Sequence, residues 1–343
     1  MSGFVAKEFF PDALLARLTE LRVRDPEFAF RAAQQRVRRK SLTVDGKLNI
    51  IAADHPARFV TKVGDDPLGM ADRREYLARM LRVLQSERVD GVMASMDILE
   101  DLLAVDGLLR EAGAKTLLDG RVMVGSMNRG GLAGAAWELD DPMTGVTAKV
   151  CAEWKLDGAK ALLRVDAQEP DSLKTMMYCA QAITECNALK LPMFLEPLPV
   201  QKTEAGYPVV KEAGAVARLA GVSSALGDSS RYLWLKLPYT ENFEVVARST
   251  TLPIVLLGGE SAGDPRPFLA QLGAAMKAGA NVRGAMVGRN VLFPGDEDPL
   301  AIAEAAGRMV HDGADVEAAM SALVSVRGTK LDVLAAATRG GAR

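Results

Sequence analysis

The stretch YLWLKLPY, residues 232–239, sets a single lysine in an apolar run. Successive side chains of a strand point to opposite faces, so Tyr232, Trp234 and Lys236 share one face and three leucines share the other. An all-leucine face suits packing against helices, which turns Lys236 toward the inside of a closed sheet. Lys236 also lies just before Pro238, at the strand end where barrel active sites are found. The stretch therefore predicts a buried lysine at the mouth of an α/β barrel.

Seven further apolar runs share the length of this one and are bounded by Gly, Pro or Asp, as buried parallel strands are. They lie at 48–54, 90–95, 121–127, 159–166, 191–198, 253–261 and 284–292. Segments with helical periodicity separate them. In the segment after the fourth run, Asp171 is the expected N-cap and one face carries Leu173, Met176, Met177, Ala180 and Ile183. Eight alternations predict a (β/α)8 TIM barrel, and a doubly wound open sheet is the alternative.

The rest of the chain is expected to form one domain with two short additions. Residues 1–47 read as an N-terminal helical extension that ends in the basic stretch RVRRKS, residues 48–330 as the barrel, and 331–343 as a frayed C-terminal tail. The extension would cover the barrel bottom or meet another subunit. Its Phe9, Phe10, Phe28 and Phe30 favour a homo-oligomer, although they could equally pack on their own barrel. The basic stretch reads as a solvated face rather than as a nucleic-acid site.

Composition narrows the class of protein. The formal net charge of −2 gives no field that would attract nucleic acid or acidic lipid. Charged residues interrupt the N-terminal apolar positions, and no window approaches the roughly 18 apolar residues of a spanning helix, so we expect a soluble, cytoplasmic protein without membrane contact. The three cysteines, Cys151, Cys179 and Cys186, read as reduced thiols packed in helices. With two histidines, a metal site built on several imidazoles is impossible, and we expect no metal and no cofactor.

Several other strands end in groups that match Lys236. Lys160 and Arg164 share a face of the fourth strand, Glu196 faces inward on the fifth, and Asp54 ends the first. Each could be half of a structural ion pair, and Lys236 could itself pair with a carboxylate for stability alone. Together they indicate a site, because so many desolvated charges would otherwise cost stability.

The last two strands end in glycine-rich loops, the position at which barrels commonly hold a phosphate. The expected phosphate-binding residues are Gly258, Gly259, Glu260, Ser261, Gly288 and Arg289. Tight turns without a ligand are the alternative. His55, which follows Asp54, could also touch a substrate.

Over residues 48–312 the chain resembles class I aldolases of the tagatose-bisphosphate and archaeal fructose-bisphosphate aldolase type. LWLKLPYT resembles their Schiff-base strand, AADHP the strand with an active-site aspartate, MFLEPL the strand with a catalytic glutamate, and LLGGES with VGRNVL their phosphate-binding ends. The resemblance implies a catalytic set of Lys236, Glu196, Lys160 and Asp54 and a phosphorylated sugar substrate. Arg164 departs from the tagatose-type pattern, so the cation of the fourth strand could be Lys160 or Arg164.

Within this group the chain looks closest to a bacterial branch linked with inositol catabolism. That likeness implies cleavage of 6-phospho-5-dehydro-2-deoxygluconate to dihydroxyacetone phosphate and malonate semialdehyde, with Arg164 on the substrate carboxylate. Two other functions stay open. One is a thiolase-like barrel enzyme that moves an acyl group to coenzyme A with a similar lysine. The other is a non-catalytic sugar-phosphate-binding protein, which would form no imine.

Overall fold

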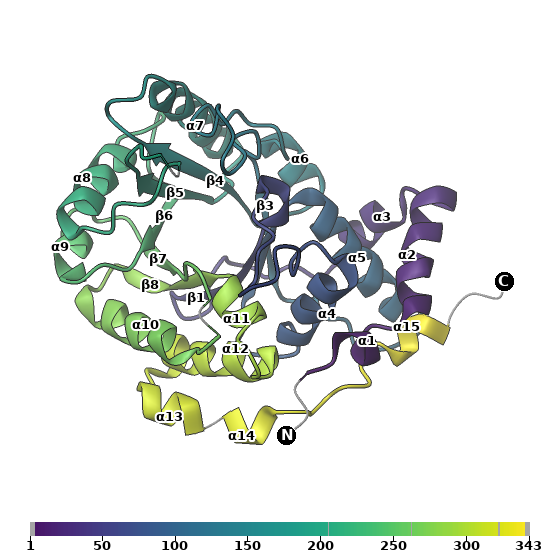
Figure 1. Cartoon of the computed structure of the whole chain (residues 1–343). Coiled ribbons are helices and arrows are strands. Elements are labelled where there is room, and N and C mark those ends of the chain that lie inside the picture. The colour runs from purple at the N-terminus through teal and green to yellow at the C-terminus, as the bar shows by residue number, and fades with distance from the viewer. Residues whose placement is uncertain (1–3, 205, 262, 322, 340–343) are drawn as a thin grey trace.

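A closed barrel of eight parallel strands forms the centre of the molecule, as the alternation of apolar runs predicts (Figure 1). The computed structural model describes residues 4–204, 206–261, 263–321 and 323–339. Each strand pairs with the next in sequence, and β1 closes the ring on β8. The strands are β1 (Leu48–Ala53), β2 (Gly91–Ala94), β3 (Val122–Ser126), β4 (Gly158–Val165), β5 (Met193–Pro199), β6 (Leu233–Pro238), β7 (Ile254–Leu257) and β8 (Val282–Val287).

Helices surround this ring and connect its strands (Figure 1). The helices between strands are α4 (Arg73–Val83), α5 (Met96–Glu111), α6 (Ala148–Glu153), α7 (Asp171–Ala188), α8 (Ala213–Ser224), α9 (Phe243–Ala247) and α10 (Arg266–Ala278), with a 3₁₀ turn η1 (Pro56–Arg58) after β1. Those before and after the barrel strands are α1 (Ala6–Phe9), α2 (Asp12–Arg24), α3 (Phe28–Gln35), α11 (Arg289–Leu292), α12 (Pro299–Gly307), the π-helical η2 (Arg308–Asp312), α13 (Val316–Ser321), α14 (Leu323–Val326) and α15 (Ala335–Arg339).

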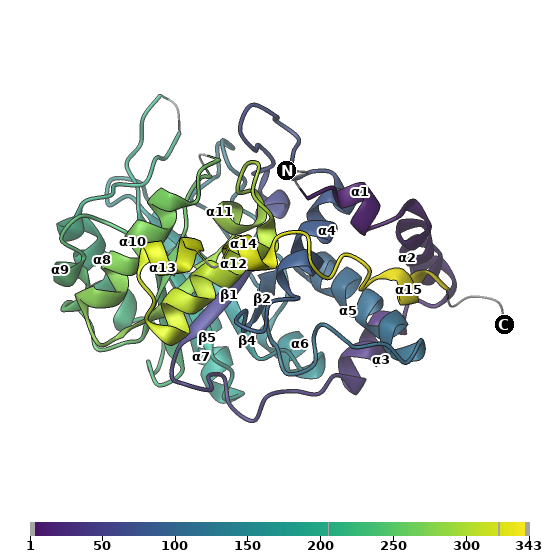
Figure 2. The same cartoon turned by 90° about the horizontal axis from the view of Figure 1, so that it is seen from below.

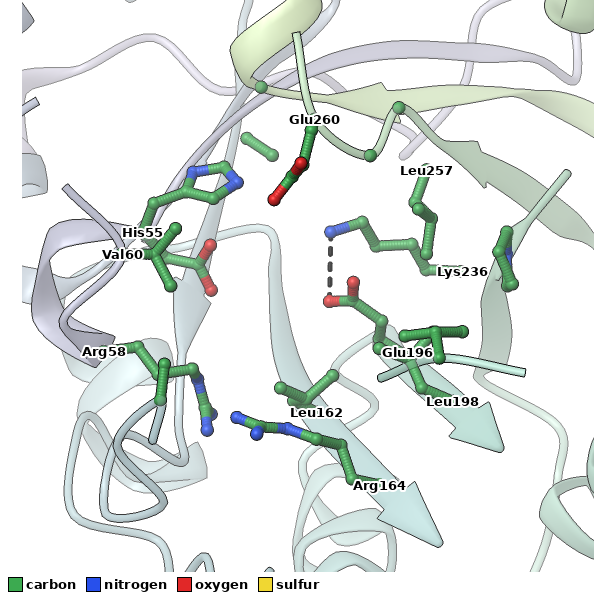
Figure 3. A pocket seen from close by; sticks show the side chains of 18 of the residues that line it. His55, Arg58, Val60, Leu162, Arg164, Glu196, Leu198, Lys236, Leu257 and Glu260 are labelled. Carbon is green, nitrogen blue, oxygen red and sulfur yellow. Dashed lines mark hydrogen bonds and ion pairs between the residues drawn. The ribbon is translucent and has the colours of Figure 1, made fainter. Parts of the chain in front are cut away.

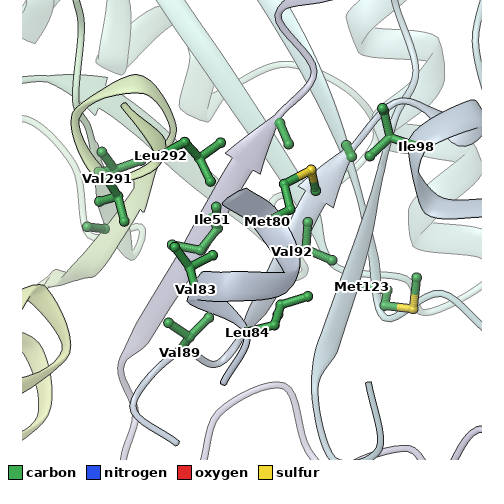
Figure 4. Close-up of a cluster of buried hydrophobic side chains, with 14 of the residues drawn as sticks. Ile51, Met80, Val83, Leu84, Val89, Val92, Ile98, Met123, Val291 and Leu292 are labelled. Carbon is green, nitrogen blue, oxygen red and sulfur yellow. The ribbon is translucent and has the colours of Figure 1, made fainter. Parts of the chain in front are cut away.

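The strand alternation separates two layers of apolar side chains. The inner layer fills the barrel with Leu48, Ile50, Ala52, Met93, Val122, Val124, Phe194, Val255 and Met286. The outer layer packs against the helices, and Figure 4 shows Ile51, Val92 and Met123 on their strands with Met80 and Val83 of α4 nearby. On β6 the leucines belong to the outer layer and Trp234 packs against the inner one, which leaves Lys236 inside the barrel.

Helix α7 buries a different face from the one that its largest apolar residues suggest. Leu173 and Met177 are 62% and 63% exposed. Asp171, the expected N-cap, is instead the first residue of the helix; Pro170 is the N-cap, and no side chain caps this end by a hydrogen bond. The buried positions recur at helical spacing, and all but Ile183 are small or weakly polar: Ser172, Thr175, Cys179, Ala182, Ile183, Cys186 and Asn187. Small side chains let the helix approach β4 and β5 closely. The predicted apolar face is therefore confirmed at Ile183 and in part at Met176, and wrong at Leu173 and Met177. The three cysteines are free and buried, as expected.

The N-terminal helices lie beside the barrel and not across its bottom. Figure 2 shows α1, α2 and α3 on the side where α4 and α5 run, and α3 and α5 make the most extensive of these contacts. Phe9, Phe10 and Phe28 are buried against this chain's own core, and the ring of Phe30 lies 5.1 Å from that of Trp154. The phenylalanines therefore take the second of their two predicted roles, and a homo-oligomer stays a prediction.

The basic stretch after α3 crosses the N-terminal end of the barrel strands. Arg36 and Arg38 contact the two carboxylate oxygens of Asp157, just before β4, at 2.9 and 2.8 Å. Arg39 lies 2.7 Å from Asp90, just before β2. The side chain of Arg36 is fully buried, so the predicted solvated face is wrong at this position. The stretch fixes the extension to the barrel by ion pairs.

The segment after residue 330 packs on the molecule as far as it is described. Helix α15 contacts α2 and α5, Ala337 is buried, and Arg17 donates to the Ala337 carbonyl at 2.8 Å. The expected frayed tail is therefore docked up to residue 339, and residues 340–343 lie outside the described part. No helix in the described ranges has both the length and the apolar character needed to cross a membrane.

Candidate active site

A cavity of about 600 Å³ opens where the strands end at their carboxyl termini. Four charged side chains that the sequence singles out line it together: Asp54 after β1, Lys160 on β4, Glu196 on β5 and Lys236 on β6. Figure 3 shows Glu196 and Lys236 directed at each other across the cavity floor. The alternation of a strand explains this placement, because every second side chain of β4, β5 and β6 faces the barrel axis.

The four groups form a chain of alternating charge. The Lys160 Nζ lies 2.6 Å from Glu196 Oε2 and 3.2 Å from Asp54 Oδ2. The Lys236 Nζ lies 3.0 Å from the same Glu196 oxygen. Glu196 thus stands between two amines, and Lys160 joins it to Asp54. Among the described residues Arg164 forms no hydrogen bond or ion pair with Glu196 or Asp54, so Lys160 is the strand-four cation that this geometry joins to Lys236.

Burial and neighbouring charge shift the pKa values of these groups in different directions. Burial lowers the pKa of Lys236, and its attraction to Glu196 offsets that only in part. Burial alone would raise the pKa of Glu196, but Lys160 and Lys236 outweigh it and lower this pKa to about 2. The pKa of Asp54 falls well below its usual value because Arg129 and Lys160 outweigh its burial. The site therefore keeps both carboxylates ionised and makes the Lys236 amine easier to deprotonate than an ordinary lysine.

Arg129, in the loop after β3, completes this chain, and the sequence pattern does not single it out. Its NH1 lies 2.5 Å from Asp54 Oδ2, and its NH2 donates to the Asp54 carbonyl oxygen. Ser126 donates to the same carboxylate oxygen at 3.0 Å, so Arg129 NH1, Lys160 and Ser126 all donate to Oδ2. Loops carry no side-chain periodicity, and the only local signal is a cation beside two glycines.

Arg164 lies in a second group of charges at another part of the cavity wall. It forms an ion pair with Glu138, from the loop after β3, and its NH2 donates to the Gly131 carbonyl at 3.2 Å. Nearby, Arg58 is paired with Asp141 at 2.5 Å. Burial, with the Arg58 charge in the same direction, lowers the pKa of Arg164 to about 9. Glu138 and Arg58 also lie outside the residues that the sequence predicts for the site, since neither belongs to a periodic strand.

The glycine-rich loops after β7 and β8 form another part of the wall. Gly258, Gly259, Glu260, Gly288 and Arg289 line the cavity. A Cβ atom on Gly288 would lie 2.4 Å from a β1 carbonyl oxygen, so this close approach requires glycine. The Arg289 NH1 lies 3.6 Å from Glu260, whose side chain is 88% exposed. The buried Nε of Arg289 has no hydrogen-bond partner in the described part of the chain.

Ser261 stands apart from the other predicted phosphate-binding residues. Its hydroxyl donates to the Phe293 carbonyl at 2.7 Å, and it does not line the cavity. The ionised carboxylate of Glu260 has no hydrogen-bond donor to offer a phosphate. In this structure it forms an ion pair with Arg289. The sequence analysis groups Glu260 and Ser261 with the phosphate ligands because they follow Gly259. Neighbouring residues in a loop can, however, direct their side chains to different sides.

The two histidines lie at opposite ends of the barrel. His55 lines the cavity, and burial lowers its pKa to about 3, which makes it a neutral imidazole at physiological pH. His311 in η2 contacts Asp45 and Asp90 at the other end, at 2.9 and 3.0 Å. In the described ranges, no group of three or more His, Cys, Asp or Glu residues is placed to hold a metal ion.

The cavity wall carries an excess of positive charge. Seven cationic and four anionic side chains line it, so the excess is three charges with Lys236 protonated and two with Lys236 neutral. A cavity of this kind favours an anionic ligand over a neutral one.

Comparison with known proteins adds a family to this geometry. A family model described as Cgl0159-like matches residues 46–307. The crystal structure of Cgl0159 from Corynebacterium glutamicum is 38% identical, covers 89% of this chain and 98% of its own, and superposes with a TM-score of 0.82.

Two more distant relatives carry the word aldolase in their names. An uncharacterized aldolase of Saccharolobus solfataricus is 32% identical over 142 residues, which are 40% of this chain and 48% of that relative. The matched part therefore spans about half of the relative's length. An archaeal fructose 1,6-bisphosphate aldolase structure is 20% identical, covers 83% of this chain and all of its own, and has a TM-score of 0.58, which is a likeness of fold.

Proposed function

This chain belongs to the Cgl0159-like family, and we propose that it is a class I aldolase that acts through a Schiff base on Lys236. One observation carries the proposal: Lys236 is a buried amine whose protonation is disfavoured and whose Nζ lies 3.0 Å from a carboxylate shared with a second lysine. A neutral amine is the nucleophile that imine formation needs. The aldolase names among the more distant relatives support the same reaction class.

The first half of the reaction joins Lys236 to a ketone. The Nζ lone pair attacks the carbonyl carbon, and the carbonyl oxygen takes a proton to give a carbinolamine. Glu196 lies 3.0 Å from this nitrogen and contacts Lys160 in turn, and the two relay protons until the hydroxyl leaves as water and a protonated imine remains. While Lys236 is a neutral amine, Glu196 has one cationic neighbour instead of two and is a better base.

The second half breaks a carbon–carbon bond. The electrons of the bond between the α and β carbons move toward the iminium and form an enamine, while the β hydroxyl loses its proton and becomes an aldehyde. Asp54 can hold that hydroxyl, because the donors from Arg129, Lys160 and Ser126 all end on Oδ2 and leave Oδ1 available. Protonation of the enamine and hydrolysis of the imine release the ketone and restore Lys236.

The glycine-rich part of the wall supplies the place for a phosphate. Gly258, Gly259 and Gly288 bring backbone close to the cavity, and Arg289 adds a guanidinium whose Nε is without a partner in the described chain. Binding energy from a phosphate held there positions the reacting carbonyl over Lys236. Glu260 leaves Arg289 when the phosphate arrives, since a carboxylate and a phosphate repel each other.

The finer part of the proposal is the substrate, 6-phospho-5-dehydro-2-deoxygluconate, which would yield dihydroxyacetone phosphate and malonate semialdehyde. Its phosphate and carboxylate suit a wall on which cationic side chains outnumber anionic ones, although one of these cations, Arg58, is paired with Asp141 behind the wall. Arg164 faces the cavity apart from the glycine loops and is placed to meet the carboxylate, although it must share its charge with Glu138. A link with inositol catabolism rests on this substrate alone.

Borohydride trapping with dihydroxyacetone phosphate tests the reaction class. We expect a reduced adduct on Lys236 by peptide mass spectrometry and none in Lys236→Met, with the circular dichroism spectrum unchanged. Normal turnover in Lys236→Met would refute the proposal. Condensation assays then compare malonate semialdehyde with glyceraldehyde 3-phosphate as acceptor, and preference for the latter would refute the substrate but keep the aldolase. A product that forms only with coenzyme A would instead indicate acyl transfer.

A further inference from the structure

Five buried groups form one electrostatic unit around Lys236. Arg129 contacts Asp54, Asp54 contacts Lys160, Lys160 contacts Glu196, and Glu196 contacts Lys236. Side-chain exposure in this unit does not exceed 11%, so water screens these charges weakly. A buried unit of this kind is stable when its charges sum to zero, because desolvation penalises any net charge.

The sum of charges in this unit depends on Arg129. With Asp54 and Glu196 ionised and Arg129 and Lys160 protonated, the unit is neutral only if Lys236 carries no proton. Without the Arg129 charge, the neutral unit is the one in which Lys236 is an ammonium. The identity of one loop residue thus decides which form of the amine the buried site prefers.

Most other charged groups around the cavity are paired outside this unit, although Arg164 also attracts Glu196. Arg164 is paired with Glu138 and Arg58 with Asp141, so each of these pairs sums to zero. Arg289 lies 3.6 Å from Glu260, whose exposed carboxylate is screened by solvent, and Arg289 forms no hydrogen bond or ion pair with the five groups in the described chain. His55 is neutral, and β2 and β7 present the apolar Met93 and Val255 to the barrel interior. Lys211 lines the cavity but is exposed, so solvent screens its charge.

We propose that Arg129 is the positioning residue that sets the protonation of Lys236, by supplying the third positive charge of this five-group unit. The inference rests on the proposed role of Lys236 as the nucleophile. Arg129 does not touch the amine. It acts through Asp54, by taking up the negative charge that would otherwise favour an ammonium at the other end of the chain.

The test measures the amine directly, without a substrate. Trace acetylation by acetic anhydride at a series of pH values reports the neutral fraction of each lysine, and peptide mass spectrometry resolves Lys236. Replacing Arg129 by methionine should raise the midpoint of the Lys236 profile by at least about one unit, which gives about tenfold slower acetylation at pH values below both midpoints. Arg129→Lys, which keeps the charge, should restore the wild-type profile.

A second pair of variants separates charge from shape. Asp54→Asn removes a negative charge from the same contact and should lower the midpoint, while Asp54→Asn with Arg129→Met should return it toward the wild-type value. Ser126→Ala removes a neutral donor from Asp54 and should leave the midpoint in place. A purely structural role for Arg129 predicts shifts in one direction for all of these variants, and that result would overturn the inference.

Two further results bear on the inference independently of whether Arg129→Met folds. A wild-type Lys236 with the midpoint of an ordinary exposed lysine would overturn it, and so would an Asp54→Asn profile that does not move downward. Borohydride trapping on the wild-type enzyme is scored separately. An absent imine with shifted acetylation profiles would refute the proposed aldolase while leaving the charge balance intact.

Discussion

Asp157 holds the N-terminal extension to the bottom of the barrel, and its replacement by asparagine should strongly destabilise the fold. Its Oδ2 accepts from Arg36 at 2.9 Å and from the Met123 amide at 2.9 Å, and its Oδ1 accepts from Arg38 at 2.8 Å. The Arg36 side chain is fully buried and keeps two carbonyl contacts, but no other carboxylate is paired with it in the described chain. Breaking a buried ion pair from one side costs about 3–5 kcal/mol.

Equilibrium urea unfolding, followed by tryptophan fluorescence, measures this loss. The matched control is Arg38→Met, which removes the partner whose side chain is 44% exposed and should cost at most about 1 kcal/mol. In Arg36→Met with Asp157→Asn, both charges of the buried pair are gone, so stability should recover above that of Asp157→Asn alone. A loss below about 1 kcal/mol in Asp157→Asn, or a double variant less stable than the single one, would refute the reasoning.

Two more predictions concern His311 and Glu260. The His311 pKa is raised, chiefly by its hydrogen bond to Asp90, so its contribution to stability is complete below the unfolded pKa of about 6.5 and is lost as pH rises through the folded pKa. The urea midpoint of the wild type should fall as pH rises through that window, and the midpoint of His311→Gln should not show this fall. The same pH dependence in both proteins would contradict the prediction. Glu260→Gln removes the carboxylate that competes with phosphate for Arg289. Calorimetry should show inorganic phosphate binding about threefold tighter, because an exposed ion pair contributes less than about 1 kcal/mol. Weaker binding would contradict this and would mean that Glu260 helps to hold the phosphate.

Strand periodicity explains why most of the barrel and half of the site follow from the sequence. The period of two is enough to place Lys160, Glu196 and Lys236 on inward faces, because the neighbouring leucines define the outward face. Asp54 follows from its position at the end of an apolar run. These side chains meet since parallel strands of a closed barrel end at the same rim.

The remaining site residues depend on loops, whose course the local sequence does not fix. Arg129, Glu138 and Arg58 reach the cavity from segments without periodicity. Ser261 is the opposite case, because the sequence predicts it in the site but it does not line the cavity. Its hydroxyl donates to the Phe293 carbonyl instead. On α7, apolar residues such as Leu173 face outward because close packing on the strands selects small side chains. Tertiary contacts decide all of these positions.

Closure of the ring by β1 and β8 has a consequence during protein synthesis. β1 emerges from the ribosome early but gains its second neighbouring strand only when β8 is made. The two strands then pair in parallel, with Ile50 opposite Met286. Until that moment a nascent chain exposes unpaired amides and carbonyls along β1, an edge on which other chains can assemble. Arg289 arrives at the same late stage. Translation that stalls before β8 therefore leaves an aggregation-prone and incomplete barrel.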